Sequence, residues 1–216
     1  MAEKRADTPK VVNPKDVAMK MRLDYSRGVR DPLTRNLEAL CGLCRLLEKP
    51  NVDTHAFMHE VASVIMKDFA IESVAIGVKD AADKRFRYRT VMGLENDVAE
   101  GFKGLSYSRE ELLAPSNYPA YDISDRTKLF LAEDRPYAPG EEFTYRRPGL
   151  IGMKRRTLTE SLEADYLDFF FNGPDGDYLG FIEISGTRLR TLPDTATIRW
   201  IELIATMLGI ALQKAR

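Results

Sequence analysis

Residues 178–185, YLGFIEIS, decide the fold together with the long apolar segment that follows them. In a strand, successive side chains point to opposite faces, which places Leu179 and Phe181 on one face and Ile182 and Ile184 on the other. Apolar side chains on both faces predict a strand that is covered, or nearly covered, from both sides. Such a strand belongs near the middle of a sheet.

The segment after this strand predicts a helix that begins near Leu192 or Pro193 and runs to the end of the sequence. Asp194 supplies the acidic side chain that the first turn of a helix favours. Two apolar stripes recur at spacings of three and four: Ile198, Ile201, Ala205, Leu208 and Leu212 form one, and Trp200, Ile204, Met207 and Ala211 form the other. A helix with two stripes is buried on two sides. We expect one side to lie on the sheet and the other against a helix of this chain, of a second copy, or of both.

The rest of the sequence predicts helices before the sheet and a long insertion within it. Apolar periodicity predicts helices over residues 33–48 and from Asp53 or Thr54 to about Phe69. Strands are predicted over residues 73–79, 85–91 and 165–172, with helical pieces at 95–102 and 109–113 and brief strands at 128–131 and 142–146. This order indicates an α+β fold in which helices gather on one face of an antiparallel sheet.

The closing strand and helix resemble those of GAF domains, which are small-molecule sensor modules. The resemblance is carried by residues 179–184 (LGFIEI), by Leu192 and Pro193, and by residues 201–205 (IELIA) and 210–215 (IALQKA). The most similar variant is the one found in microbial sensor histidine kinases. The resemblance spans residues 33–215 and implies a GAF/PAS-like antiparallel sheet with the N- and C-terminal helices packed on one face. It also implies that the insertion before the final hairpin forms the lid and wall of a ligand pocket.

Length and composition predict one domain with a short appendage. The chain has 216 residues, 30% of them charged, with a net charge of −1. We predict a GAF-like domain over residues 31–216 and a flexible basic arm over residues 1–30. The arm could serve a nucleic acid or a partner, but it lacks a DNA-binding motif, which favours a solvated leader. Near-neutral charge also argues against nucleic-acid or membrane partners.

The expected location is the cytoplasm. No apolar run in the sequence approaches the roughly 20 residues that span a bilayer, and the charged N-terminus is followed by no hydrophobic segment. The two cysteines form no disulfide framework, in keeping with a reducing compartment.

The residue types that carry catalysis or bind metals form no convincing site. Cys41 and Cys44 make a Cys-x-x-Cys on the apolar side of the first long helix, which indicates buried packing before redox or metal chemistry. His55 and His59 have a spacing that can bind a metal, yet the pattern of a zinc protease is absent, and a solvated helix surface is the better interpretation. The sequence therefore predicts no catalytic residue and no metal site, and it names no cofactor.

The insertion carries the predicted ligand site. Cations and aromatic residues gather there, and the predicted ligand-binding residues are Tyr121, Phe130, Phe143, Tyr145, Arg146 and Arg147. We expect an anionic or aromatic small molecule. The alternative is a solvated basic loop that neighbouring acidic residues balance.

The predicted function is that of a stand-alone, non-enzymatic sensor or signalling module. The sequence ends directly after the closing helix, so we expect output through homodimerisation by a four-helix bundle or through a signalling partner. The predicted dimer interface comprises Leu37, Cys44, Ile201, Ala205, Leu208 and Leu212. Two alternatives remain: a small redox enzyme resembling free methionine sulfoxide reductase, with Cys41 and Cys44 as its thiols, and a ligand-free dimerising scaffold.

Overall fold

The computed structural model of the protein describes residues 13–28, 31–174 and 176–215. The chain divides into two compact units, one ending at Ala39 and one beginning at Leu40. This division falls within helix α2 (Pro32–Leu47), whereas the sequence predicts a boundary just before that helix. Residues 1–12 and 29–30 of the predicted basic arm lie outside the described residues. The arm's described part forms helix α1 (Pro14–Gly28).

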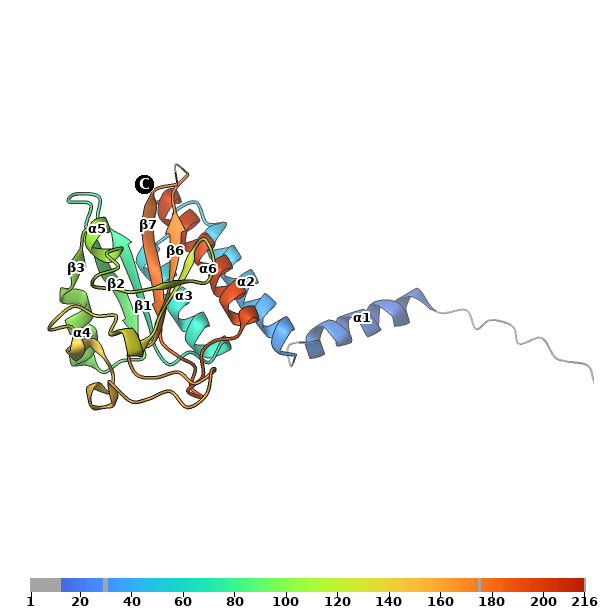
Figure 1. The fold of residues 1–216 in the computed structure, drawn as a ribbon. Helices are drawn as coiled ribbons and strands as arrows, with labels where there is room; N and C mark the ends of the chain where they lie inside the picture. Colours follow the sequence, from blue (N-terminus) through green and yellow to red (C-terminus); the bar gives the residue numbers. More distant parts are fainter. Residues whose placement is uncertain (1–12, 29–30, 175, 216) are drawn as a thin grey trace, which may run out of the picture. The chain divides into compact units, whose positions relative to one another are not determined.

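The larger unit is built on a seven-stranded antiparallel sheet with the order β3-β2-β1-β7-β6-β5-β4 (Figure 1). The strands are β1 (Val74–Lys79), β2 (Phe86–Met92), β3 (Ser106–Tyr107), β4 (Tyr121–Asp122), β5 (Thr127–Phe130), β6 (Tyr166–Asn172) and β7 (Tyr178–Ile184). Strand β7 pairs with β1 on one side and with β6 on the other, which confirms its predicted central place.

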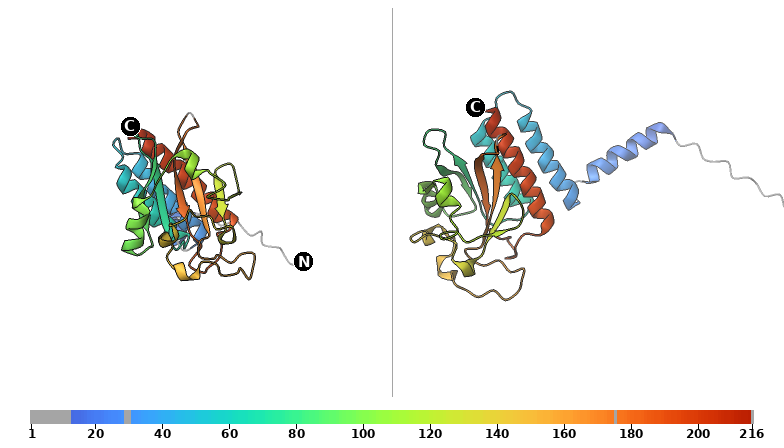
Figure 2. Two further views of the ribbon diagram at one scale, coloured as in Figure 1. Left: turned by 60° about the vertical axis from the view of Figure 1, so that its left-hand side comes forward. Right: turned by 45° about the horizontal axis from the view of Figure 1, so that its top comes forward.

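Helices α3 (Thr54–Asp68) and α6 (Thr195–Lys214) pack against one face of the sheet and against each other (Figure 2). Asp53 caps α3 by accepting hydrogen bonds from the backbone N–H groups of His55 and Ala56. Asp194 caps α6 in the same way, at 2.8 Å from the N–H of Thr197. Because this cap fixes the first turn, α6 begins slightly later than the predicted start near residues 192–193.

Both faces of the central strands are buried, as the sequence predicts. Phe169 pairs with Ile182 on the face that α6 covers, and Phe170 pairs with Phe181 on the opposite face. Short helices α4 (Asn96–Gly104) and α5 (Arg109–Leu112) cover that opposite face at one end. The aromatic cluster there comprises Phe86, Tyr88, Phe102, Phe170 and Phe181. Burying each such ring contributes roughly 1.5–3 kcal/mol.

The insertion and the segment just before it depart from their predicted structure. Residues 142–146 are not a strand, because Glu142–Thr144 forms a 3-10 turn. Further 3-10 turns occupy Ala132–Asp134 and Pro148–Leu150. The two-residue strands β3 and β4 were not predicted, since so short a strand is defined by its partner in the sheet and not by a pattern of its own.

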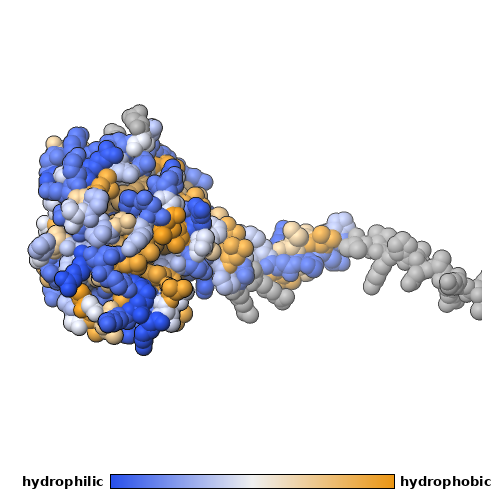
Figure 3. Space-filling view, in the orientation of Figure 1, coloured by the Kyte–Doolittle hydropathy of each residue, from blue (hydrophilic) through white to orange (hydrophobic). Residues whose placement is uncertain are grey.

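The predicted dimer stripe on α6 is wrong at three positions. Ile201, Ala205 and Leu208 are at most 1% exposed within the single chain, so they belong to its core. The large apolar residues that α6 leaves exposed are Leu203 and Ile210, at 46% and 45%. Apolar groups also gather on the surface in the region of α6 (Figure 3). The sequence revealed two stripes, but only the packed structure shows which surface meets the sheet.

The other predicted interface residues differ in exposure. Leu37 and Cys44 on α2 are exposed, and Leu212 on α6 is partly buried. Helix α6 is, by length and composition alone, apolar enough to cross a membrane, contrary to the expectation that no segment approaches this length. Its packing against the sheet accounts for this composition, because the core helix of a folded domain has the same character.

A polar contact ties α6 to the turn between β4 and β5. Glu202 Oε1 accepts a hydrogen bond from Ser124 and another, at 2.8 Å, from the hydroxyl of Thr127, a residue that is fully buried. Arg199 pairs with the other oxygen of Glu202 from an exposed position. The buried bonds should therefore matter more to stability than the exposed ion pair.

We expect Glu202→Ala to lower the free energy of unfolding by about 1–3 kcal/mol, because the Thr127 hydroxyl loses its acceptor in a buried place. Arg199→Ala is the matched control and should cost under about 0.5 kcal/mol. Urea denaturation of both variants measures the difference. Equal losses in the two variants would contradict the importance given to the buried bonds.

Candidate functional site

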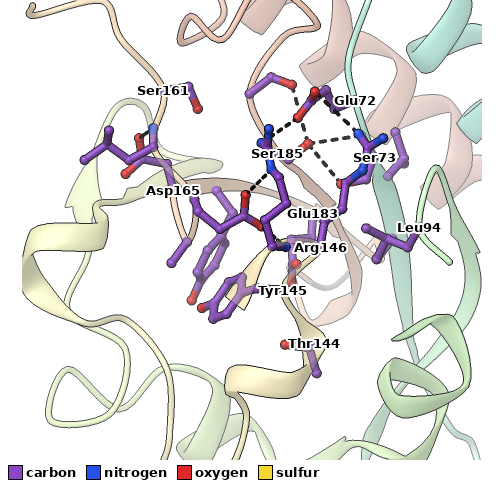
Figure 4. A pocket seen from close by; sticks show the side chains of 18 of the residues that line it. Glu72, Ser73, Leu94, Thr144, Tyr145, Arg146, Ser161, Asp165, Glu183 and Ser185 are labelled. Carbon is purple, nitrogen blue, oxygen red and sulfur yellow. Dashed lines mark hydrogen bonds and ion pairs between the residues drawn. The ribbon is translucent and has the colours of Figure 1, made fainter. Parts of the chain in front are cut away.

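A cavity opens on the sheet face opposite α6, beside the ends of β1 and β7 (Figure 4). About 60 Å³ of it admits the centres of water-sized molecules, and about 650 Å³ of space lies between its walls when the open solvent at its mouth is included. Its lining comes from residues 72–75, Leu94, Phe102, residues 144–147, residues 161–166, Glu183, residues 185–187 and Arg190. Segments that are far apart in the sequence thus meet around one hollow. We call residues 144–147 and 161–165 the lid segments.

The lid segments bring two of the predicted cations to the cavity, but both are paired. Arg147 bonds Glu163 at 2.8 Å and Glu72 at 3.3 Å. Arg146 lies 3.4 Å from the same Glu72. Their charges are therefore largely balanced at the mouth. An anionic ligand would have to compete with these carboxylates for either guanidinium.

Asp165 fixes the second lid segment. Its side chain is fully buried, and its oxygens accept hydrogen bonds from the N–H groups of Ala132 and Leu162 at 2.9 and 2.7 Å. Arg155 reaches the same carboxylate at 2.9 Å and also bonds Glu133. A buried carboxylate with this many donors is well satisfied. It anchors the insertion to the start of β6.

The floor of the cavity carries a carboxyl group of β7. Glu183 accepts a hydrogen bond of 2.6 Å from the Tyr88 hydroxyl of β2. Across the β6–β7 ladder, Glu183 pairs with Asp168, so both carboxyl groups lie on the same face of the sheet. Asp168 is 3% exposed, and its Oδ1 has no hydrogen-bond partner in the described part of the chain. We call Glu183 and Asp168 the carboxyl pair.

Burial raises the pKa of both members of the carboxyl pair. For Glu183 the pKa rises to about 7, although the hydrogen bond from Tyr88 lowers it. For Asp168 burial raises the pKa well above its ordinary value, and the negative charge of Glu183 raises it further. Adjacent buried carboxyl groups resist simultaneous ionisation. A group that binds at this floor can therefore change their protonation.

The structure brings together three of the six predicted ligand-binding residues. Tyr145, Arg146 and Arg147 line the cavity. The other three do not line it, and their ligand-binding role stays a prediction. Tyr121 lies exposed on β4, Phe130 is buried and stacks on Tyr166 at 4.3 Å between ring centroids, and Phe143 is 51% exposed. The folding of the insertion, which sequence periodicity does not encode, separates them.

Sequence reasoning missed the carboxyl pair. Each member is a single acid within an otherwise apolar strand: Glu183 in YLGFIEI and Asp168 in YLDFFFN. A lone ionisable residue at a buried strand position is itself a signal, because burying an unpaired charge is costly. This signal could have been read from the two strand sequences, and it marks the sheet face on which the cavity lies.

The cysteines and histidines lie away from the cavity. Cys41 and Cys44 are exposed on α2, contrary to their predicted burial, because Leu40 and Leu43, one position earlier on the helix, take the buried side. Neither cysteine lines the cavity. His55 and His59 are both exposed on α3. Within residues 13–28, 31–174 and 176–215, no three His, Cys, Asp or Glu side chains are grouped so as to hold a metal ion.

Comparisons with known proteins identify the fold. No protein-family model matches the sequence. No curated protein matches it either. Among solved structures, the GAF domain of a phosphoenolpyruvate-protein phosphotransferase from Coxiella burnetii is similar at 13% identity and a TM-score of 0.54, over 84% of this chain and 94% of that one. The chain has the GAF fold.

Two further structures agree with this assignment. A GAF domain/HD domain protein from Geobacter sulfurreducens matches at 12% identity and a TM-score of 0.50, over 80% of this chain and 95% of that one. A segment of a methyl-accepting chemotaxis protein matches at 12% identity and a TM-score of 0.52, over 82% and 98%. The predicted α+β sheet with terminal helices on one face is confirmed. At these identities the GAF likeness concerns the fold alone.

The carboxyl pair should make stability fall as the pH rises. The pKa of Glu183 is raised from 4.5 to about 7, so within that window the folded state binds more protons than the unfolded state. At about 1.4 kcal/mol per pKa unit, we expect this shift to lower wild-type stability by about 3 kcal/mol across the window. Glu183→Gln should remove the part of this dependence of stability on pH that Glu183 contributes, and it should leave the part that Asp168 contributes. Thermal denaturation between pH 4.5 and 8 measures this, with Glu100→Gln as a surface control. Identical slopes in wild type and Glu183→Gln would contradict the raised pKa.

Proposed function

We propose that the chain is a non-enzymatic sensory or signalling module that binds a small molecule in the cavity beneath the lid segments. The observation that carries the proposal is the cavity itself. It has a polar floor at Glu183, an aromatic wall at Tyr145 and a mouth framed by ion pairs. Concave sites that combine apolar walls with a few fixed polar groups are typical of ligand pockets. The solved structures with this fold include a chemotaxis protein segment, which supports a sensory class.

The proposed output passes through α6. Glu183 faces the cavity, while its strand neighbours Ile182 and Ile184 are buried on the side of α6, so a change at the floor acts on a strand that the helix contacts. The exposed residues Leu203 and Ile210 lie seven positions apart, on one side of that helix. We propose that this side joins a second copy of the chain or a signalling partner, with the cytoplasm as the setting.

Two other functions receive less support. A thiol-based redox enzyme would need Cys41 or Cys44 near the substrate, and neither residue lines the cavity. A ligand-free scaffold needs only the association surface. The cavity would then be incidental to the fold. Native mass spectrometry separates the scaffold from the sensor.

We expect freshly purified protein to carry a discrete non-covalent adduct in native mass spectra. Leu94→Trp places a larger side chain at a partly buried position of the cavity lining and should abolish the adduct. Leu189→Trp, at a position that is 84% exposed and outside the cavity, should retain it. An adduct that survives Leu94→Trp would show binding elsewhere. A dimer without an adduct would favour the scaffold.

We expect Leu203→Glu combined with Ile210→Glu to convert a dimer into a monomer, because the change introduces like charges on an exposed apolar surface. Leu189→Glu is the control and should keep the mass of the wild type. Size-exclusion chromatography with light scattering measures the masses. A double variant that remains dimeric would exclude this side of α6 as the interface.

A further inference from the structure

We propose that the cavity recognises an organic cation: a small molecule that presents a protonated amine or amidinium group to Glu183, with a flat apolar body against Tyr145 and Tyr166. Asp168 pairs with Glu183 across the β6–β7 ladder and does not line the cavity itself. The inference rests on the proposed function and deepens it by naming the chemical class of the ligand.

The first step is a balance of charge around the cavity. Its other acidic residues have cationic partners: Glu72 and Glu163 pair with Arg147, and Asp165 pairs with Arg155. Glu183 differs, because its one hydrogen-bond donor among the described residues is the neutral hydroxyl of Tyr88. Among the described lining residues, Glu183 is therefore the carboxylate without a cationic partner, while the exposed Arg190 is the remaining cation of the lining. A cationic ligand would meet this carboxylate at the floor.

The second step concerns Asp168. Its side chain is almost fully buried, and Oδ1 has no hydrogen-bond partner in the part of the chain that the structure describes. Lys128 pairs with Asp168 across the β5–β6 ladder, but its Nζ bonds Asp122 at 2.6 Å. Among the residues that the structure describes, the carboxyl pair thus has no cation in hydrogen-bond contact. A buried carboxylate without such a partner is costly, and removing that cost favours a cationic ligand.

Aromatic side chains form the walls of the cavity. Tyr145 and Tyr166 line the cavity, and burial raises the pKa of both phenols, which keeps them neutral. The Tyr166 hydroxyl donates to the carbonyl of Pro136, which fixes its ring beside the floor. Neutral aromatic rings attract organic cations through their faces. Leu94 and Phe102 add apolar lining, so a small aromatic amidine matches the site in charge and in character.

The test uses benzamidine as the cationic probe and benzoate, which has the same ring and the opposite charge, as its match. Isothermal titration calorimetry at pH 8 should show benzamidine binding to the wild type and no binding of benzoate. Glu183→Gln should weaken benzamidine at least tenfold, and Asp168→Asn should weaken it less. Glu100→Gln, on the exposed surface of α4, should leave it unchanged. Circular dichroism and thermal denaturation check that each variant is folded.

Several results would overturn the inference, and they separate it from the proposed function. Unchanged benzamidine affinity in folded Glu183→Gln would remove the floor as the cation site. Benzoate binding, or a retained adduct that lacks a basic nitrogen, would replace the ligand class and leave the sensor proposal standing. If neither probe binds and native mass spectra show no adduct, the sensor proposal fails as well.

Discussion

The pairing of β6 with β7 is the interaction on which the rest of the structure depends. These strands bring Phe169 and Ile182 to the side of α6, and Phe170 and Phe181 to the opposite face. The backbones of β7 and β1 lie so close at Gly180 that only glycine fits there. An added Cβ would lie 2.2 Å from the carbonyl oxygen of Gly77 in β1. The ladder therefore fixes the helix layer, the aromatic cluster and the cavity floor together.

The same ladder carries a feature that opposes stability. Glu183 and Asp168 interrupt two apolar strands at paired positions, where hydrophobic residues would pack at no electrostatic cost. Proteins that break a local rule of this kind commonly do so at functional sites. The other acidic groups of the described lining, Glu72, Glu163 and Asp165, have arginine partners, which makes the exception at the floor the more informative. The carboxyl pair lies between the lid segments and a strand that supports α6. A ligand bound at the cavity floor can therefore act on that strand and, through it, on the surface of the helix.

Much of the fold could be predicted from sequence period alone. Strand β7, helix α3 with its Asp53 cap, and the apolar stripes of α6 all follow from local patterns. The orientation of a helix with two stripes could not be predicted, because both stripes are apolar and only the packed sheet selects between them. For the same reason Cys41, one position from the buried Leu40, was predicted on the wrong side of α2.

The site was only partly predictable for a different reason. The insertion is held by single long-range contacts, such as that of Arg155 with Asp165, which leave no periodic trace in the sequence. The most direct measurement is an NMR titration of the Glu183 side-chain carboxyl with and without benzamidine. The account predicts a pKa of about 7 in the free protein and a lower value in the complex, because a bound cation favours the charged form. A pKa near the ordinary glutamate value, unmoved by benzamidine, would contradict it.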